Sequence, residues 1–179
     1  MVRQIRDIAM TAVTIKKIEA LSPYRADLET LLTDSIDSGA SIGFVAPLQE
    51  HEVPEYWNEV ERKLSEHFVC FVALKDNKAV GCVKLETPTK TNGNHRAEIQ
   101  KLMVHRNHQG QGIAKALMMN AEKFAKDNGL KLLVLDTRLG DVASTLYRRL
   151  DYIEAGQIPM FARSSNGDLE ATVYFYKAL

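Results

Sequence analysis

Two glycines close together in the second half of the chain have the spacing of an anion-binding turn. The segment consists of Gln109, Gly110, Gln111, Gly112, Ile113 and Ala114. Small residues let the backbone approach a ligand closely and tolerate positive φ. The apolar residues that follow recur at helical spacing, which predicts that the turn opens a helix. The free N–H groups of a first helical turn, with the helix dipole behind them, favour an anion such as phosphate.

The same turn has two other interpretations. It can simply join a strand to a helix. It can also belong to a dinucleotide-binding fold, since Asp136 lies where a ribose-binding acid is found. Against the second, the third glycine of that motif is Lys115 here, and residues 105–108 separate the preceding strand from the turn. The chain beyond Asp136 is also too short for further βαβ units, so we reject the dinucleotide-binding interpretation.

Length and composition predict one domain. The chain has 179 residues, with 23 Lys+Arg and 23 Asp+Glu. We expect the domain to span residues 13–179, after a flexible N-terminal arm at residues 1–12. The neutral net charge gives no reason to expect nucleic acid or an anionic membrane as partner. No stretch has the length of a membrane span or the pattern of a signal peptide, which predicts a cytoplasmic location. Cys70 and Cys82 lack the spacing of a zinc site, so no metal is expected.

Hydrophobic periodicity predicts an α/β fold with the element order β-α-α-β-β-β-α-β-α-β-β. Strands are expected at residues 13–18, 68–74, 79–86, 96–104, 132–135, 153–161 and 169–176. Helices are expected after Ser22, across residues 53–64, from Gly112 to about Asn128, and after Asp141. The short apolar run at 132–135 predicts a strand buried on both faces.

The turn and its neighbouring segments resemble the GNAT acetyltransferase superfamily. Gln109, Gly112 and Ala114 match its motif Gln/Arg-x-x-Gly-x-Gly/Ala in register. Residues 99–104 resemble the splayed strand that lines the pantetheine, and residues 146–152 resemble the family's Tyr-x-x-x-Gly-Tyr/Phe segment. Two positions depart from the family: Gly140 replaces a common asparagine, and Asp151 replaces the glycine of the second motif. The resemblance implies a mixed, mostly antiparallel sheet flanked by helices and splayed at the cofactor site.

Within the superfamily the chain most resembles the tabtoxin resistance acetyltransferases. This narrower likeness rests on residues 93–104, supported by residues 135–137 and 39–44. It implies acetyl transfer from acetyl-CoA to a primary or secondary amine of a small molecule, such as an amino-acid-like antibiotic or toxin. Two alternatives stay open, because substrate changes easily on one fold. The protein can be a protein or peptide N-acetyltransferase, or a non-catalytic acetyl-CoA-binding module. The sequence also leaves open whether the chain forms a homodimer.

The resemblance implies a set of cofactor-binding residues. The backbone of Met103 and Val104 would pair with the pantetheine, and a freed Val104 N–H would polarise the thioester carbonyl. The pyrophosphate would be bound by the backbone of Gln109, Gly110, Gln111, Gly112, Ile113 and Ala114. Arg106, His108 and the Lys115 side chain are candidates for phosphate contacts, although exposed basic residues are more often only solvated.

Three residues are candidates for catalysis. An alkylammonium must lose a proton before it attacks, so a nearby carboxylate assists. Glu98 in the middle of a strand and Asp136 at the end of the next are the candidate bases, and Tyr147 is the candidate proton donor to the leaving thiolate. The alternatives are a surface ion pair of Glu98 with Arg96 or Lys101, a cap or loop anchor at Asp136, and a packed aromatic at Tyr147. Acceptor-binding candidates are Ser41, Phe44, Trp57, Arg96, Phe161 and Arg163.

Overall fold

The structure is a computed structural model that describes residues 12–164 and 167–179. The predicted N-terminal arm lies outside the described residues, apart from Ala12. Residues 165 and 166, between the last two predicted strands, lie outside them as well. The element order matches the predicted one throughout the described part of the chain.

One seven-stranded sheet forms the centre of the fold, with the strand order β1-β2-β3-β4-β5-β7-β6. Neighbouring strands pair antiparallel, except that β4 and β5 are parallel. This confirms the predicted mixed, mostly antiparallel sheet. The strands are β1 (Thr14–Ile18), β2 (Phe68–Lys75), β3 (Lys78–Glu86), β4 (Arg96–Val104), β5 (Leu132–Arg138), β6 (Ile153–Arg163) and β7 (Leu169–Ala178).

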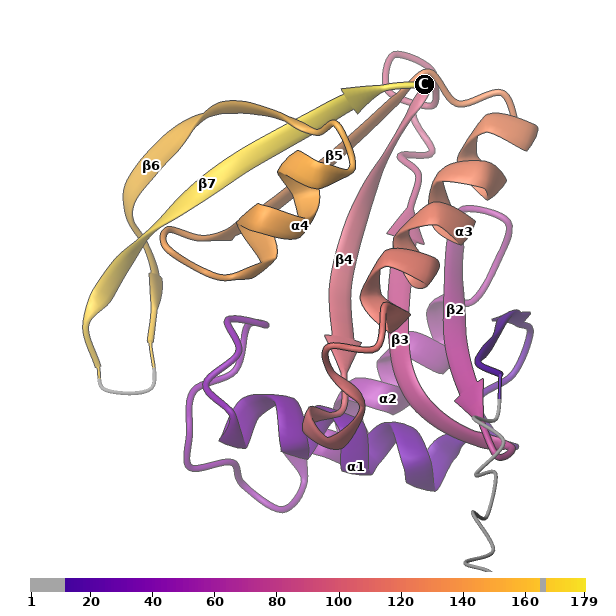
Figure 1. The fold of residues 1–179 in the computed structure, drawn as a ribbon, viewed down its shortest axis with the longest axis vertical. Coiled ribbons are helices and arrows are strands. Elements are labelled where there is room, and N and C mark those ends of the chain that lie inside the picture. The colour runs from indigo at the N-terminus through magenta and orange to yellow at the C-terminus, as the bar shows by residue number, and fades with distance from the viewer. Residues whose placement is uncertain (1–11, 165–166) are drawn as a thin grey trace, which may run out of the picture.

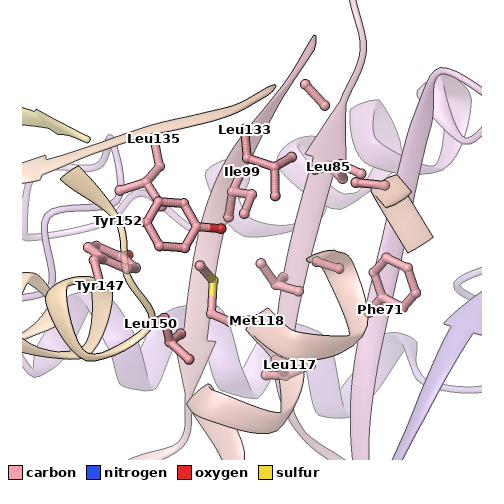
Figure 2. Packing of buried hydrophobic residues seen from close by; sticks show 14 of the residues in the cluster. Phe71, Leu85, Ile99, Leu117, Met118, Leu133, Leu135, Tyr147, Leu150 and Tyr152 are labelled. Atoms are coloured by element: carbon pink, nitrogen blue, oxygen red, sulfur yellow. The ribbon is translucent and has the colours of Figure 1, made fainter. Parts of the chain in front are cut away.

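Helices cover both faces of the sheet (Figure 1). On one face, α1 (Arg25–Asp37) and α2 (Glu52–Lys63) pack on β2 and β3 and bury Trp57 completely. On the other face, α3 (Ile113–Asp127) and α4 (Ala143–Arg149) cover the second core cluster. Figure 2 shows this cluster, which joins Met118 of α3 with Tyr147 and Leu150 of the α4 region. A 3-10 turn, η1 (Arg106–His108), precedes the glycine turn.

The prediction that the 132–135 strand is buried on both faces was wrong. Leu133, Leu135 and Thr137 are buried, while the alternating residues between them are half-exposed. An apolar run fits a strand covered on both faces, but β5 has a helix-covered core on one face only. Its second face carries Val134 and Asp136, and the strand continues to Arg138.

The strands β4 and β5 separate along their length (Figure 1). Their register contains only three pairs, Arg96 with Leu132, Ala97 with Leu133 and Glu98 with Val134. Beyond Glu98 the β5 side of β4 has no strand partner among the described residues. This short pairing leaves an opening between β4 and β5 in the middle of the sheet, as the predicted splay requires.

A β-bulge in β4 lies beside this opening. Gln100 pairs with Lys84 and Met103 pairs with Cys82, so two residues of β4 oppose the single residue Val83. Lys101 within the bulge has a φ of +51°. The extra residue reverses the alternation of side chains. As a result, Ile99 packs on the α3 side of the sheet, whereas Met103 packs on the α1 side.

Candidate active site

The glycine turn lies between η1 and the first turn of α3. Gly110 has a φ of +72° and Gly112, the N-cap residue of α3, has a φ of +80°. A Cβ added at either glycine would meet no atom within 4 Å, so this side of the turn is open. The helix has no side-chain cap. In the described part of the chain, no backbone N–H from Gly110 to Lys115 donates to a protein acceptor.

Two side chains secure the turn from behind. Gln109 Nε2 donates to the carbonyl of Val104 at 3.0 Å, which ties the turn to the end of β4. Lys75 Nζ donates to Gln111 Oε1 at 3.0 Å, which ties it to the end of β2. These contacts hold the turn by its side chains and leave its backbone N–H groups available. An anion at the helix N-terminus would meet several donors and the positive end of the helix dipole.

The basic residues around the turn differ in what they contact. The Arg106 backbone N–H donates to Asp34 Oδ2 at 2.9 Å, and its guanidinium Nε donates to Asp34 Oδ1. The Asp34 side chain is only 10 % exposed, so Arg106 anchors η1 to α1 and is not a free cation. Burial lowers the pKa of His108, which disfavours a charged imidazole beside the turn. Lys115, exposed in the first turn of α3, has no ion pair within the described ranges.

The backbone of β4 presents alternating groups to the opening. The His105 N–H donates to the Val80 carbonyl of β3 at 2.9 Å. Because backbone groups of successive strand residues point to opposite edges, the N–H and C=O of Val104 point away from β3. The bond from Gln109 to the Val104 carbonyl agrees with this direction. The Met103 backbone, one residue earlier, faces β3.

A cavity of about 440 Å³ occupies the opening between β4 and β5. It is lined by α4 and by the α1–α2 loop at residues 40–43, which belong to opposite faces of the sheet, so it extends through the opening. The cavity brings together all three candidate catalytic residues and three candidate acceptor residues: Glu98, Asp136, Tyr147, Ser41, Phe161 and Arg163.

Three other acceptor candidates lie elsewhere. Phe44 packs edge-on against Tyr56, with 5.4 Å between the ring centroids, and lines a separate cavity along α2. Arg96 begins β4 in the part that is still paired with β5. Trp57 is fully buried in the α1–α2 core. These residues were candidates because of the resemblance, and their side chains do not line the cavity.

Glu98 is a half-buried carboxylate in a polar environment. It pairs with Glu86 of β3 and Val134 of β5 in the strand register. Burial raises the pKa of Glu98, and the negative charges of Asp136 and Glu86 raise it further. A hydrogen bond from Gln100 and the charge of Arg96 act in the opposite direction. The predicted surface ion pair of Glu98 with Arg96 or Lys101 does not form among the described residues.

Asp136 is attached to the neighbouring strand. Thr172 Oγ1 of β7 lies 2.7 Å from Asp136 Oδ2 and 2.9 Å from the carbonyl of Thr137. A hydroxyl has only one proton, so these two contacts share it. The bond holds one oxygen of Asp136, and the residue also lines the cavity. This contact attaches Asp136 of β5 to β7, and the catalytic role of Asp136 stays a prediction.

Tyr147 is 6 % exposed and packs between two aromatic rings. Its ring centroid lies 6.0 Å from that of Tyr152 and 5.8 Å from that of Phe175. Burial raises the pKa of the Tyr147 hydroxyl, so it keeps its proton near neutral pH. Within residues 12–164 and 167–179 this hydroxyl has no hydrogen-bond partner, although the side chain lines the cavity. A protonated hydroxyl at the cavity can donate to a group bound there.

Known proteins are similar to this chain in sequence and in fold. A family model described as the Acetyltransferase (GNAT) family matches residues 33–152. The chain belongs to the GNAT acetyltransferase family. The human protein N-acetyltransferase 8B is 36 % identical over 116 residues, which cover 63 % of this chain and 51 % of that protein. The chain thus spans about half the length of these curated relatives, which include N-acetyltransferase 8F1 of the rat.

Solved structures agree on the fold. An acetyltransferase structure from Acinetobacter baylyi superimposes with a TM-score of 0.79 at 17 % identity and covers 96 % of this chain and 94 % of its own. A Salmonella typhimurium acetyltransferase, described with its cofactor acetyl-CoA, gives a TM-score of 0.75 at 17 % identity and covers 94 % of each chain. Together with the family match, these structures confirm the predicted GNAT fold.

The departure at Asp151 from the GNAT pattern has a structural explanation. Asp151 follows α4 with a φ of +63°, a conformation that glycine adopts without strain. The Tyr152 N–H donates to the Tyr147 carbonyl and the Asp151 N–H to the Arg148 carbonyl, which closes the helix end. Aspartate is one of the residues that tolerate this conformation. The family's turn is therefore retained here without its glycine.

Several residues that line the cavity were missed from the sequence. Gln100 lies two residues beyond Glu98, and Arg138 two beyond Asp136, so the period of a strand could have found both. Thr172 comes from β7, and nothing in its local sequence indicates its contact with Asp136. Lys101 also lines the cavity, and it lies in the bulge of β4, where the side-chain alternation of a regular strand does not hold.

The described residues contain no cluster of three or more His, Cys, Asp or Glu side chains placed to hold a metal ion. Across the same ranges, no helix has both the length and the apolar composition needed to cross a bilayer.

Proposed function

We propose that this protein transfers the acetyl group of acetyl-CoA to a primary or secondary amine of a small molecule. The observation that carries the proposal is the cavity between β4 and β5, where Glu98, Asp136 and Tyr147 meet at the edge of a strand with unpaired backbone. The glycine turn at the start of α3 supports the choice of cosubstrate.

The glycine turn fits the pyrophosphate of coenzyme A. Its backbone N–H groups have no protein acceptor, the helix lacks a side-chain cap, and the space beside Gly110 and Gly112 is open. A row of N–H donors at a helix N-terminus is suited to a diphosphate. Lys115 is the basic side chain best placed to add a charge contact, because Arg106 is already held by Asp34.

The β5 side of β4 fits the pantetheine arm. An extended ligand chain can add to an unpaired strand edge through backbone hydrogen bonds. The Val104 N–H points to this edge and would donate to the thioester carbonyl, where negative charge develops during the reaction. The acetyl-CoA supplies the activated acetyl group, and every other contribution comes from the chain.

Side chains that line the cavity would accept and donate the protons of the reaction. Glu98, or Asp136 through water, accepts the proton of the acceptor ammonium, which frees its lone pair to attack. The C–N bond then forms while the C–S bond breaks, and the Tyr147 hydroxyl donates a proton to the leaving sulfur. The second proton that the nitrogen loses as the amide forms passes through water to restore the Tyr147 hydroxyl, and the proton on the carboxylic acid leaves to solvent. The raised pKa of Glu98 makes it a better base near neutral pH, and the raised pKa of Tyr147 keeps its proton in place until the thiolate forms.

The charges around the cavity favour an amino-acid-like acceptor. Carboxylates at Glu98 and Asp136 suit an ammonium, while Arg138 and Arg163 line the same cavity and suit a carboxylate. Arg138 is partly neutralised by Glu170, since Arg138 Nε lies 3.3 Å from Glu170 Oε2. The volume of about 440 Å³ lies in the range of small-molecule sites. The likeness to the tabtoxin resistance acetyltransferases, a role in antibiotic resistance, a cytoplasmic location and a homodimer remain predictions.

The proposal is tested by measuring free-thiol release from acetyl-CoA with a panel of acceptors. The panel contains amino-acid-like primary and secondary amines, tabtoxinine-like compounds included, and a set of peptides with free N-termini or lysines. We expect turnover with at least one small amine, and intact mass to show one added acetyl group. Turnover with peptides alone would establish the protein-directed alternative. Tight coenzyme A binding without turnover on any acceptor would establish a binding module.

A further inference from the structure

The side chain of Lys101 connects the two halves of the proposed site. Lys101 belongs to the bulge of β4, three residues before Val104. Its Nζ donates to the carbonyl of Ile42 in the α1–α2 loop. This contact spans 59 positions of sequence. Lys101 and residues 40–43 both line the cavity between β4 and β5, so the bond joins the cofactor strand to the wall on the acceptor side.

Two unusual backbone conformations bring the partners together. Lys101 itself has a φ of +51°, which is uncommon for a residue with a long side chain. Gly43, next to the accepting carbonyl, has a φ of +85°. A Cβ added at Gly43 would lie only 2.8 Å from Lys101 Nζ. The ammonium therefore occupies the space that any other residue type at position 43 would fill.

Two carboxylates that line the cavity favour the charged form of Lys101. Burial lowers the pKa of Lys101, whereas the carboxylates of Asp136 and Glu98 raise it. A half-buried ammonium needs a hydrogen-bond acceptor, and a backbone carbonyl provides one without adding a second charge. Both proposed catalytic acids thus help to keep Lys101 attached to the loop.

We infer that Lys101 is a positioning residue that holds the loop at residues 40–43 as the acceptor-side wall of the site. It determines the affinity for the amine and leaves the affinity for acetyl-CoA unchanged. Gly43 is needed for the same contact, because its lack of a side chain leaves space for the Lys101 ammonium. This inference rests on the proposed function for its link to the amine, whereas the link between Lys101 and the loop stands on the structure alone.

The first measurement needs no activity. Hydrogen–deuterium exchange is followed at residues 40–46 in the protein without ligands. We expect Lys101→Met to speed exchange there by about tenfold or more, as loss of a hydrogen bond from a charged group predicts, and Lys101→Arg to restore at least part of the protection. Lys126→Met, an exposed lysine of α3, is the matched control and should leave this segment unchanged. Unchanged exchange in Lys101→Met would overturn the inference.

The second measurement separates the two substrates. Lys101→Met should raise the KM for the amine by about tenfold with the KM for acetyl-CoA within about twofold, and Lys101→Arg should recover part of the loss. A rise confined to the KM for acetyl-CoA would overturn the inference. Gly43→Ala disrupts the same contact from the side of the loop. It should also speed exchange in the loop and raise the KM for the amine, so it tests the inference if Lys101→Met does not fold. Absence of turnover in the wild-type protein would refute the proposed function, while the exchange measurement would still decide the role of Lys101.

Discussion

Replacing Gly112 with alanine is expected to lower both the stability of the fold and its affinity for coenzyme A. In the folded protein the new methyl group meets no atom within 4 Å, so it creates no clash. The φ of +80° at this position imposes a backbone strain of about 1 to 2 kcal/mol on a residue with a Cβ. The methyl group would also stand where the pyrophosphate approaches the backbone. Weakening one charge-assisted hydrogen bond costs about 1.5 to 3 kcal/mol, so we expect coenzyme A to bind about tenfold to a hundredfold more weakly.

Gly129 supplies the matched control for this variant. It follows the other end of α3 with a φ of +76° and also has no atom within 4 Å of an added Cβ. Gly129→Ala should therefore lose the same stability and keep the affinity for coenzyme A. Urea unfolding measures the first quantity, and titration calorimetry measures the second. The reasoning is refuted if Gly112→Ala binds coenzyme A as tightly as the wild type, or if Gly129→Ala loses as much affinity.

Three further predictions concern buried or catalytic groups. Lys84 is 2 % exposed, and burial lowers its pKa to about 7. Because the unfolded chain binds this proton up to its ordinary pKa while the folded chain releases it near 7, Lys84 destabilises the protein fully below pH 7 and progressively less above it. Lys84→Met should accordingly be more stable at pH 7, with an advantage that shrinks by about 1.4 kcal/mol per pH unit toward pH 10 in urea unfolding; a difference independent of pH would contradict this. Glu98→Gln should lower kcat/KM by about a hundredfold or more and flatten the acidic limb of the pH profile, which in the wild type should lie above the ordinary carboxylate range because the pKa of Glu98 is raised. An unchanged limb would assign it to another group. Tyr147→Phe should lower kcat by about tenfold or more while coenzyme A affinity stays the same, since this change removes no hydrogen bond between described residues. Wild-type turnover in this variant would exclude Tyr147 as the proton donor.

The part of the fold that follows from local pattern was predicted well. The strand at residues 96–104 was predicted with the bounds that β4 has, because its alternation and flanking turns are clear. The turn at Asp76 and Asn77, both at positive φ, joins β2 to β3 as the two residue types indicate. The glycine turn and its helix were likewise predictable, because positive φ and a free helix N-terminus depend on a few neighbouring residues.

The remaining features depend on contacts between distant segments. An apolar run alone could not show that β5 has a helix-covered core on only one face, since that depends on the departure of β4. The side of the sheet that Lys101 faces was unpredictable, because a bulge leaves no reliable sign in the sequence and reverses the alternation. Phe44 lies close in sequence to Ser41, yet it packs on Tyr56 and lines another cavity.

The central claim is that the backbone N–H groups at the start of α3 bind a diphosphate. Amide chemical shifts of an isotope-labelled sample, recorded with coenzyme A and separately with pantetheine, which lacks the diphosphate, test it most directly. We predict that coenzyme A shifts the amides of residues 110–115 and that pantetheine leaves them in place. If coenzyme A leaves these amides unshifted, or if pantetheine shifts them equally, the account is contradicted.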